Sequence, residues 1–157
     1  MNARLNIMGI PAAAKAMKHI IAANQALGAL GLTPELHELV ALRVSQINGC
    51  SFCVDMHTKE LAHAGADATR INLVAGWREA TVFTDAERAA FELAEEGTRI
   101  ADAAGGVPDD VWANAAKHYS EEQLAALVLH IALMNTFNRG NIIVRNPAGD
   151  YVPGQMG

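Results

Sequence analysis

The sequence lacks the long apolar segments that mark membrane proteins and secreted precursors. It has no run of 18 uncharged apolar residues, because the best candidate, 124–137, is shorter and contains His130 and Asn135. The amino terminus has no basic segment followed by a continuous apolar run, since Lys15 and Lys18 interrupt its apolar positions. We therefore expect no membrane contact and a cytoplasmic location.

The sequence also lacks an excess of positive charge. Twelve Lys and Arg residues face seventeen Asp and Glu residues, which gives a net charge of −5. The basic residues are scattered, with no basic stripe and no cluster of aromatic residues on which bases would stack. We therefore expect no binding to nucleic acid.

Aromatic residues are scarce, at 5% of the chain, and no segment alternates apolar and polar residues as a strand would. Apolar residues make up 51% of the 157 residues, which is enough for a sizeable core. We predict an all-α fold, a single-domain bundle of six to seven helices over residues 1–145. A Pro- and Gly-rich tail over residues 146–157 is expected to be extended or partly disordered.

Residues that begin and end helices recur along the chain. Pro11, Thr33-Pro34 and Pro108 are suited to helix starts, and the pairs Thr84/Glu87 and Ser120/Gln123 fit capping boxes. The predicted helices, bounded mostly by glycines, run approximately over residues 11–30, 34–48, 50–64, 68–76, 85–104, 108–117 and 121–139. The surplus of apolar helix surface, together with Trp77 and Trp112, indicates core or interface packing and hence a homo-oligomer.

Only two cysteines are present, Cys50 and Cys53, and both lie in the segment NGCSFCVDMH, which ends with His57. On a helix, the seven steps from Cys50 to His57 return to within about 20° of the start, so Cys50, Cys53 and His57 can share one stripe. Gly49 allows a turn just before them, which places the cysteines near a helix N-terminus, where unpaired amides favour a thiolate. His57, one turn after Cys53, can exchange a proton with that thiol.

Other interpretations of this segment remain open. A c-type haem site is excluded because Val54, not His, follows the second cysteine, and a thioredoxin-like motif would need strands. A structural zinc site would need a fourth ligand, for which His37, Glu38 and His63 are candidates. The remaining interpretation is two buried thiols beside an unrelated surface histidine.

Three further residues have both a functional and a structural interpretation. Glu38 lies on the preceding helix and can complete a relay from carboxylate to imidazole to thiol, or it can be a solvated helix-face residue. His130, in the apolar stretch ALVLHIALMNTF, can point toward the thiols, but it is more often a satisfied core or interface histidine. Glu60 can support the imidazole of His57 or lie on a solvated face.

The segment ELVALRVSQINGCSFCVDMHTKELAHAG resembles the alkyl hydroperoxidase D family within the carboxymuconolactone decarboxylase superfamily. The family motif is Glu, eleven residues, Cys-x-x-Cys, three residues and His, and Glu38, Cys50, Cys53 and His57 fill its positions. The likeness extends over roughly residues 30–145. It implies an all-helical protomer that assembles into homo-trimers or homo-hexamers.

The resemblance also implies an activity, a thiol-dependent reduction of hydroperoxides that needs no cofactor or metal. Cys53 would be the peroxidatic thiol and Cys50 the resolving thiol, with Glu38 and His57 relaying protons. A dithiol or a dihydrolipoyl protein would supply the electrons. From the residues alone the assignment stays open, because the helix start favours Cys50 as the thiolate and the step to His57 favours Cys53.

One position departs from the family pattern. Some members carry His or Tyr directly before the second cysteine, where this chain has Phe52. A weaker peroxidase activity or a different substrate would follow if a histidine there assists proton transfer. The alternatives are a Cys-x-x-Cys redox sensor, a metal clip, or a lyase like the decarboxylase branch, although that branch typically lacks the cysteine pair.

Overall fold

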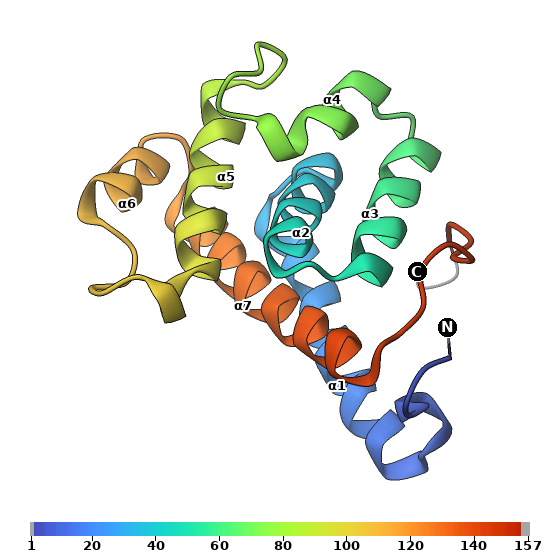
Figure 1. Cartoon of the computed structure of the whole chain (residues 1–157). Coiled ribbons are helices and arrows are strands. Elements are labelled where there is room, and N and C mark those ends of the chain that lie inside the picture. Colours follow the sequence, from blue (N-terminus) through green and yellow to red (C-terminus); the bar gives the residue numbers. More distant parts are fainter. Residues whose placement is uncertain (1, 155–157) are drawn as a thin grey trace.

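The structure of the protein, a computed structural model, describes residues 2–154. All regular elements in this range are helices, which confirms the predicted all-α fold (Figure 1). The α-helices are α1 (Pro11–Ala26), α2 (Pro34–Asn48), α3 (Ser51–His63), α4 (Ala68–Leu73), α5 (Asp85–Thr98), α6 (Asp109–Ala116) and α7 (Glu121–Val144). Short 3₁₀ turns occupy Ile7–Gly9, Leu27–Leu30, Val74–Gly76 and Ile100–Asp102. None of the described helices is long and apolar enough to cross a membrane.

Helix α2 is the centre of the bundle. It packs against α3 on one side, α5 on the other and the long helix α7 beneath (Figure 1). Two apolar clusters meet at α2, because Val40 faces α5, α6 and α7 whereas Leu39 and Leu42 face α3, α4 and α5. A helix that is apolar on several sides must be buried by neighbours all round, which is the environment of α2.

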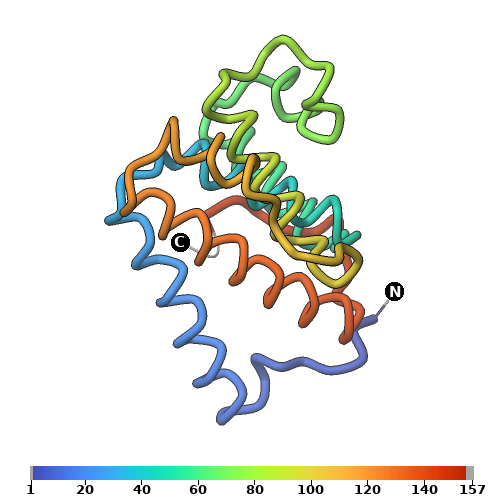
Figure 2. Tube along the Cα trace, turned by 90° about the vertical axis from the view of Figure 1, so that its left-hand side faces the viewer, coloured from blue at the N-terminus to red at the C-terminus, as the bar shows by residue number. Residues whose placement is uncertain are grey.

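Helix α1 differs from the other long helices because it has no buried residue. It extends beside α7 as an arm (Figure 2). The segment before it returns to the end of α7, where the backbone N–H of Arg4 donates to the carbonyl of Val144 at 2.7 Å.

The predicted helix starts are confirmed. The Thr33 hydroxyl accepts from the N–H of Leu36 at 3.2 Å, with Pro34 at the first helical position. Both capping boxes form, one at Thr84 and one at Ser120. Each hydroxyl satisfies an N–H that the helix itself leaves without a partner, which explains why these starts are predictable from local sequence.

Two predicted helix ends are wrong. Helix α5 ends at Thr98, not near Gly105, because Ile100 is 56% exposed and the helix has no further apolar face to bury. Helix α7 passes through Gly140 and ends at Val144. A glycine within a helix costs only about 1 kcal/mol, and Val144 is buried against the rest of the molecule.

A buried carboxylate joins α2, α5 and the turn after α4. Glu95 is 3% exposed and accepts from Arg43 Nε at 2.8 Å, from the indole of Trp77 at 2.8 Å and from Arg78 at 2.9 Å, with Arg99 at 3.3 Å. Burial raises the pKa of Glu95, but these donors outweigh it and lower that pKa to about 2. Trp77 is therefore a core residue as predicted, whereas Trp112 is 44% exposed.

The described part of the carboxyl-terminal tail is extended and lies against α3. The Lys59 ammonium donates to the carbonyls of Gly149 at 2.8 Å and Tyr151 at 3.0 Å, and the N–H of Gly149 donates to Asp55 at 2.9 Å. The Tyr151 hydroxyl donates to Glu60. The predicted tail thus begins as an ordered strap over α3, and residues 155–157 lie outside the described range.

Candidate functional site

The two cysteines lie at the joint between α2 and α3. Gly49 ends α2 in the left-handed conformation, with φ of 70°, and Cys50 is the N-cap residue of α3. The Cys50 sulfur accepts from the N–H of Cys53 at 3.3 Å, so it satisfies one of the unpaired amides at the helix start. The expected placement at a helix N-terminus is therefore observed.

Cys50 and Cys53 form a disulfide, with Cα atoms 5.3 Å apart. Each residue is only 1% exposed. The disulfide is the oxidised form of a dithiol, which has lost two protons and two electrons. Its position at a helix start favours a thiolate once the S–S bond is reduced. This site can store two electrons.

A carboxylate–imidazole pair joins α2 to α3, the helix that begins at the disulfide. Glu38 Oε2 on α2 is 2.8 Å from Nδ1 of His57 on α3. His57 is 5% exposed, so the interpretation of an unrelated surface histidine is wrong. Because the carboxylate can only accept, it fixes the tautomer in which Nδ1 carries the proton and Nε2 keeps its lone pair. That tautomer can act as a base.

The Glu38 carboxylate is held in its ionised form. Burial raises its pKa, but His37, whose Nδ1 is 4.0 Å away, and the hydrogen bond with His57 outweigh burial and lower the pKa to about 2. The carboxylate therefore stays negative over the physiological range, as a group that orients and stabilises a charged imidazole must.

Within residues 2–154, no hydrogen bond joins His57 to either sulfur. A disulfide sulfur has no proton to donate to Nε2, so this is expected of the oxidised pair. The i, i+4 step from Cys53 places the imidazole on the same side of α3 as that sulfur.

His130 is a core residue of the kind expected. It is fully buried between α2, α7 and the end of α1, and its ring stacks on that of His37 with centroids 3.5 Å apart. Its Nε2 lies 2.9 Å from the carbonyl of His37, and its Nδ1 lies 3.0 Å from the side-chain amide of Asn24. Burial, followed by the nearby His37, lowers the pKa of His130 to about 3, so it is neutral.

The other candidate residues lie away from the Glu38–His57 pair. Glu60 accepts from the carboxyl-terminal strap, His63 is exposed at the end of α3, and the ring of Phe52 packs edge-on against Tyr151 at 6.4 Å. No group of three or more His, Cys, Asp or Glu residues in the described chain is arranged to hold a metal ion. The described residues therefore include no ligand set for a structural zinc site.

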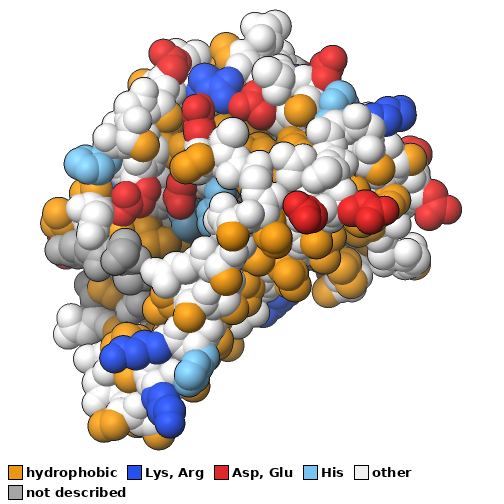
Figure 3. Space-filling model, turned by 180° about the vertical axis from the view of Figure 1, so that it is seen from behind, with side chains coloured by type: hydrophobic (Ala, Val, Ile, Leu, Met, Phe, Trp, Pro, Cys, Tyr) orange, Lys and Arg blue, Asp and Glu red, His pale blue; other side chains and the backbone are white. Residues whose placement is uncertain are grey.

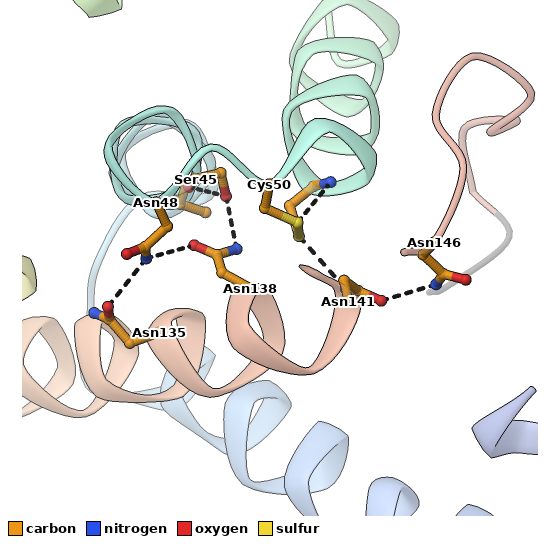
Figure 4. Close-up of a disulfide and its surroundings, with 9 residues drawn as sticks. Ser45, Asn48, Cys50, Asn135, Asn138, Asn141 and Asn146 are labelled. Carbon is orange, nitrogen blue, oxygen red and sulfur yellow. Dashed lines mark hydrogen bonds between the residues drawn. A yellow bond between two sulfur atoms is a disulfide. The ribbon is translucent and has the colours of Figure 1, made fainter. Parts of the chain in front are cut away.

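The residue that the sequence interpretation missed is Asn141. Its side-chain amide lies 3.4 Å from the Cys53 sulfur, although 88 positions separate the two residues (Figure 4). Asn135 and Asn138 precede it at steps of three on the same helix, and both accept from the amide of Asn48, at 3.0 and 2.9 Å. Three asparagines at this spacing in the mostly apolar second half of α7 were the available signal.

Comparisons with known proteins agree with this architecture. The model of the carboxymuconolactone decarboxylase family matches residues 11–96. The uncharacterized protein YdfG of Bacillus subtilis (strain 168) is 41% identical over 111 residues, which are 71% of this chain and 74% of that protein.

Solved structures share the fold. ATU0492 from Agrobacterium tumefaciens, a protein of unknown function and candidate antioxidant defence protein AhpD, has a TM-score of 0.87 at 35% identity, covering 96% of this chain and 100% of that one. The debrominase Bmp8 has a TM-score of 0.75 at 18% identity, covering 92% of this chain and 75% of that one, which is a likeness of fold alone.

Proposed function

The chain belongs to the carboxymuconolactone decarboxylase family and is AhpD-like, and from that premise we propose that it is a thiol-dependent peroxide reductase. The observation that carries the proposal is the buried Cys50–Cys53 disulfide at a helix start, next to an imidazole held by an ionised carboxylate. These are the groups that cysteine-based reduction of a hydroperoxide requires: an activated thiol, a second thiol and a proton carrier.

The first step consumes the hydroperoxide. His57 Nε2 takes the proton of the Cys53 thiol, and the thiolate attacks the terminal oxygen of R–O–OH. An S–O bond forms while the O–O bond breaks, and the alkoxide leaves as an alcohol after taking the proton from the imidazolium. Cys53 is then a sulfenic acid, oxidised by two electrons.

The second step closes the disulfide. Cys50, as a thiolate, attacks the sulfenic sulfur, so that the S–S bond forms and the S–O bond breaks. Hydroxide leaves and takes the proton released by Cys50, which gives water. The sum is one hydroperoxide and one dithiol converted to alcohol, water and the Cys50–Cys53 disulfide.

The cycle needs a reductant of the dithiol class. A small dithiol or a dihydrolipoyl protein would attack the disulfide, pass through a mixed disulfide and restore both thiols. Both sulfurs are buried, so side chains at the α2–α3 joint must move to admit it. A cytoplasmic location would suit this chemistry, because a reducing compartment keeps dithiols available.

We also propose a homo-oligomer, a trimer or hexamer. Helix α1 buries no residue within the chain, and large apolar side chains are exposed across one face (Figure 3). The exposed apolar residues in the segment before α1 and on α7 are Leu5, Met8, Ile10, Val128, Leu129, Ile142 and Ile143. An exposed apolar surface of this kind favours burial against another subunit.

The test is hydroperoxide consumption with dihydrolipoamide as reductant, for the wild type, Cys53→Ser and Cys50→Ser. We expect turnover in the wild type and none in either variant, with Cys50→Ser still reacting once per subunit. No turnover in any of the three would contradict the proposal. Disulfide formation without turnover would indicate a redox sensor, and stoichiometric zinc in the purified protein would indicate a metal clip. A decarboxylase or related lyase activity that persists when both cysteines are replaced by serine would indicate a lyase.

A further inference from the structure

The two sulfurs of the disulfide have different hydrogen-bond donors. The Cys50 sulfur accepts from a backbone N–H of its own helix, at 3.3 Å, whereas the Cys53 sulfur lies 3.4 Å from the side-chain amide nitrogen of Asn141 on α7 (Figure 4). The first contact is a consequence of any helix start. The second requires a particular residue of a distant helix, so it is a feature of this site.

The orientation of the Asn141 amide follows from its two neighbours. Its oxygen accepts from the amide of Asn146 at 2.8 Å, which leaves its NH₂ group facing sulfur. The reverse orientation would place the amide oxygen against a disulfide sulfur that has no proton to share. Only the NH₂ orientation makes a hydrogen bond on both sides.

The turn that brings Asn146 back over Asn141 has an unusual backbone. Arg145 ends α7 with φ of 55°, the only positive φ at a non-glycine residue in the described chain. The N–H of Asn146 donates to the carbonyl of Asn141 at 2.9 Å, which closes this turn. A side chain in this conformation costs roughly 1–2 kcal/mol, and such outliers cluster at functional sites.

Contacts earlier in α7 hold the position of Asn141 relative to Cys50 and Cys53. The Asn48 amide, two residues before Cys50, donates to both Asn135 and Asn138, and the Asn138 amide donates to the buried hydroxyl of Ser45 at 3.1 Å (Figure 4). These contacts tie the end of α2 to α7 one turn before Asn141. A largely buried network of side-chain hydrogen bonds favours one arrangement of the two helices.

We propose that Asn141 is a further catalytic residue, whose NH₂ group donates a hydrogen bond to the Cys53 thiolate and thereby makes Cys53, not Cys50, the thiol that attacks the hydroperoxide. The inference rests on the proposed function. A hydrogen bond to the charged form of a group favours that form, and bonds to charged acceptors are about twice as strong as neutral ones. Asn146 is a positioning residue, since it reaches the sulfur only through Asn141.

The test uses proteins with Cys53 as the only thiol. In a Cys50→Ser background, the rate of alkylation by iodoacetamide is measured against pH, alone and with Asn141→Asp, Asn141→Ala or Asn146→Ala. We expect the midpoint of the alkylation profile to rise by about one pH unit for Asn141→Ala, which is roughly a tenfold loss of thiolate at neutral pH. Asn141→Asp, which keeps the shape but replaces the donor with a negative charge, should raise the midpoint further.

Asn146→Ala is the control for folding, because it keeps the Asn141 side chain and the core and removes only the amide that orients Asn141. It should raise the midpoint by less than Asn141→Ala does. An unchanged or lowered midpoint in the Asn141 variants would overturn the inference, and so would an equal rise in all three variants, which would indicate a general loosening of α7. If the Asn141 variants lose their helical circular dichroism, the inference is judged on Asn146→Ala alone. An alkylation midpoint that does not rise in Asn146→Ala would then overturn the inference.

The two proposals fail in distinguishable ways. Alkylation needs no hydroperoxide, so the expected order of midpoints together with no peroxide turnover in the two-cysteine protein would support the Asn141 donor and contradict the peroxidase. Peroxide turnover in the wild type, together with unshifted alkylation midpoints in the Asn141 variants, would support the peroxidase and contradict the Asn141 donor.

Discussion

Replacing Glu95 with Gln tests whether its buried carboxylate holds α5 against α2. The pKa of Glu95 is lowered from 4.5 to about 2, and each unit corresponds to about 1.4 kcal/mol. The ionised carboxylate therefore stabilises the fold by about 3 kcal/mol at pH 7. Because the folded pKa is the lower one, this contribution is complete above pH 4.5 and is lost as the pH falls toward 2.

The assay is urea denaturation of wild type and Glu95→Gln at pH 7 and at pH 3. The difference in free energy of unfolding should be about 3 kcal/mol at pH 7 and about 1 kcal/mol at pH 3. At pH 3 the carboxylate of the unfolded chain, with its ordinary pKa of 4.5, is protonated, so only the smaller gap between pH 3 and the folded pKa of about 2 still stabilises the fold. Taking the difference between the two proteins removes the effect of every other titrating group.

Glu92→Gln is the matched control. Glu92 is on the same helix and meets one of the same arginines, Arg78, at 3.3 Å, but its side chain is 29% exposed. Its replacement should cost less than about 1 kcal/mol, as is usual for exposed ion pairs. A loss below about 1 kcal/mol for Glu95→Gln at pH 7, or an equal loss at both pH values, would refute the reasoning.

Three further substitutions test the site and its scaffold. Glu38→Gln should lower the rate of hydroperoxide reduction by on the order of 10²-fold without unfolding the protein, because the imidazole loses the charge that supports its protonated form; wild-type turnover would show that the relay is not used. Gly49→Ala should cost about 1 kcal/mol in urea denaturation, since its φ of 70° disfavours a side chain although an added Cβ would meet no atom within 4 Å, and a loss several times larger would indicate a steric clash instead. Ser120→Ala removes the N-cap of α7 and should lower the free energy of unfolding by about 1 kcal/mol, with no effect expected if the capping box is dispensable.

Much of the fold was predictable because its signals are local. Helix starts at Thr33, Thr84 and Ser120 depend on a side chain and an N–H three residues apart, so a single sequence contains both partners. Helix ends were less predictable. The ends of α5 and α7 depend on how far an apolar face finds something to pack against, which is a property of the neighbours.

The sequence by itself determined the chemistry that is available: a pair of cysteines at a helix start, with a histidine one turn later and a glutamate on the helix before. The tertiary structure decided which groups meet. It brought Glu38 to 2.8 Å from His57, buried His130 as a neutral core residue, and placed Asn141 against Cys53 across 88 positions of chain. Contacts within one helix follow from its 3.6-residue period, whereas contacts between helices depend on how the whole core packs.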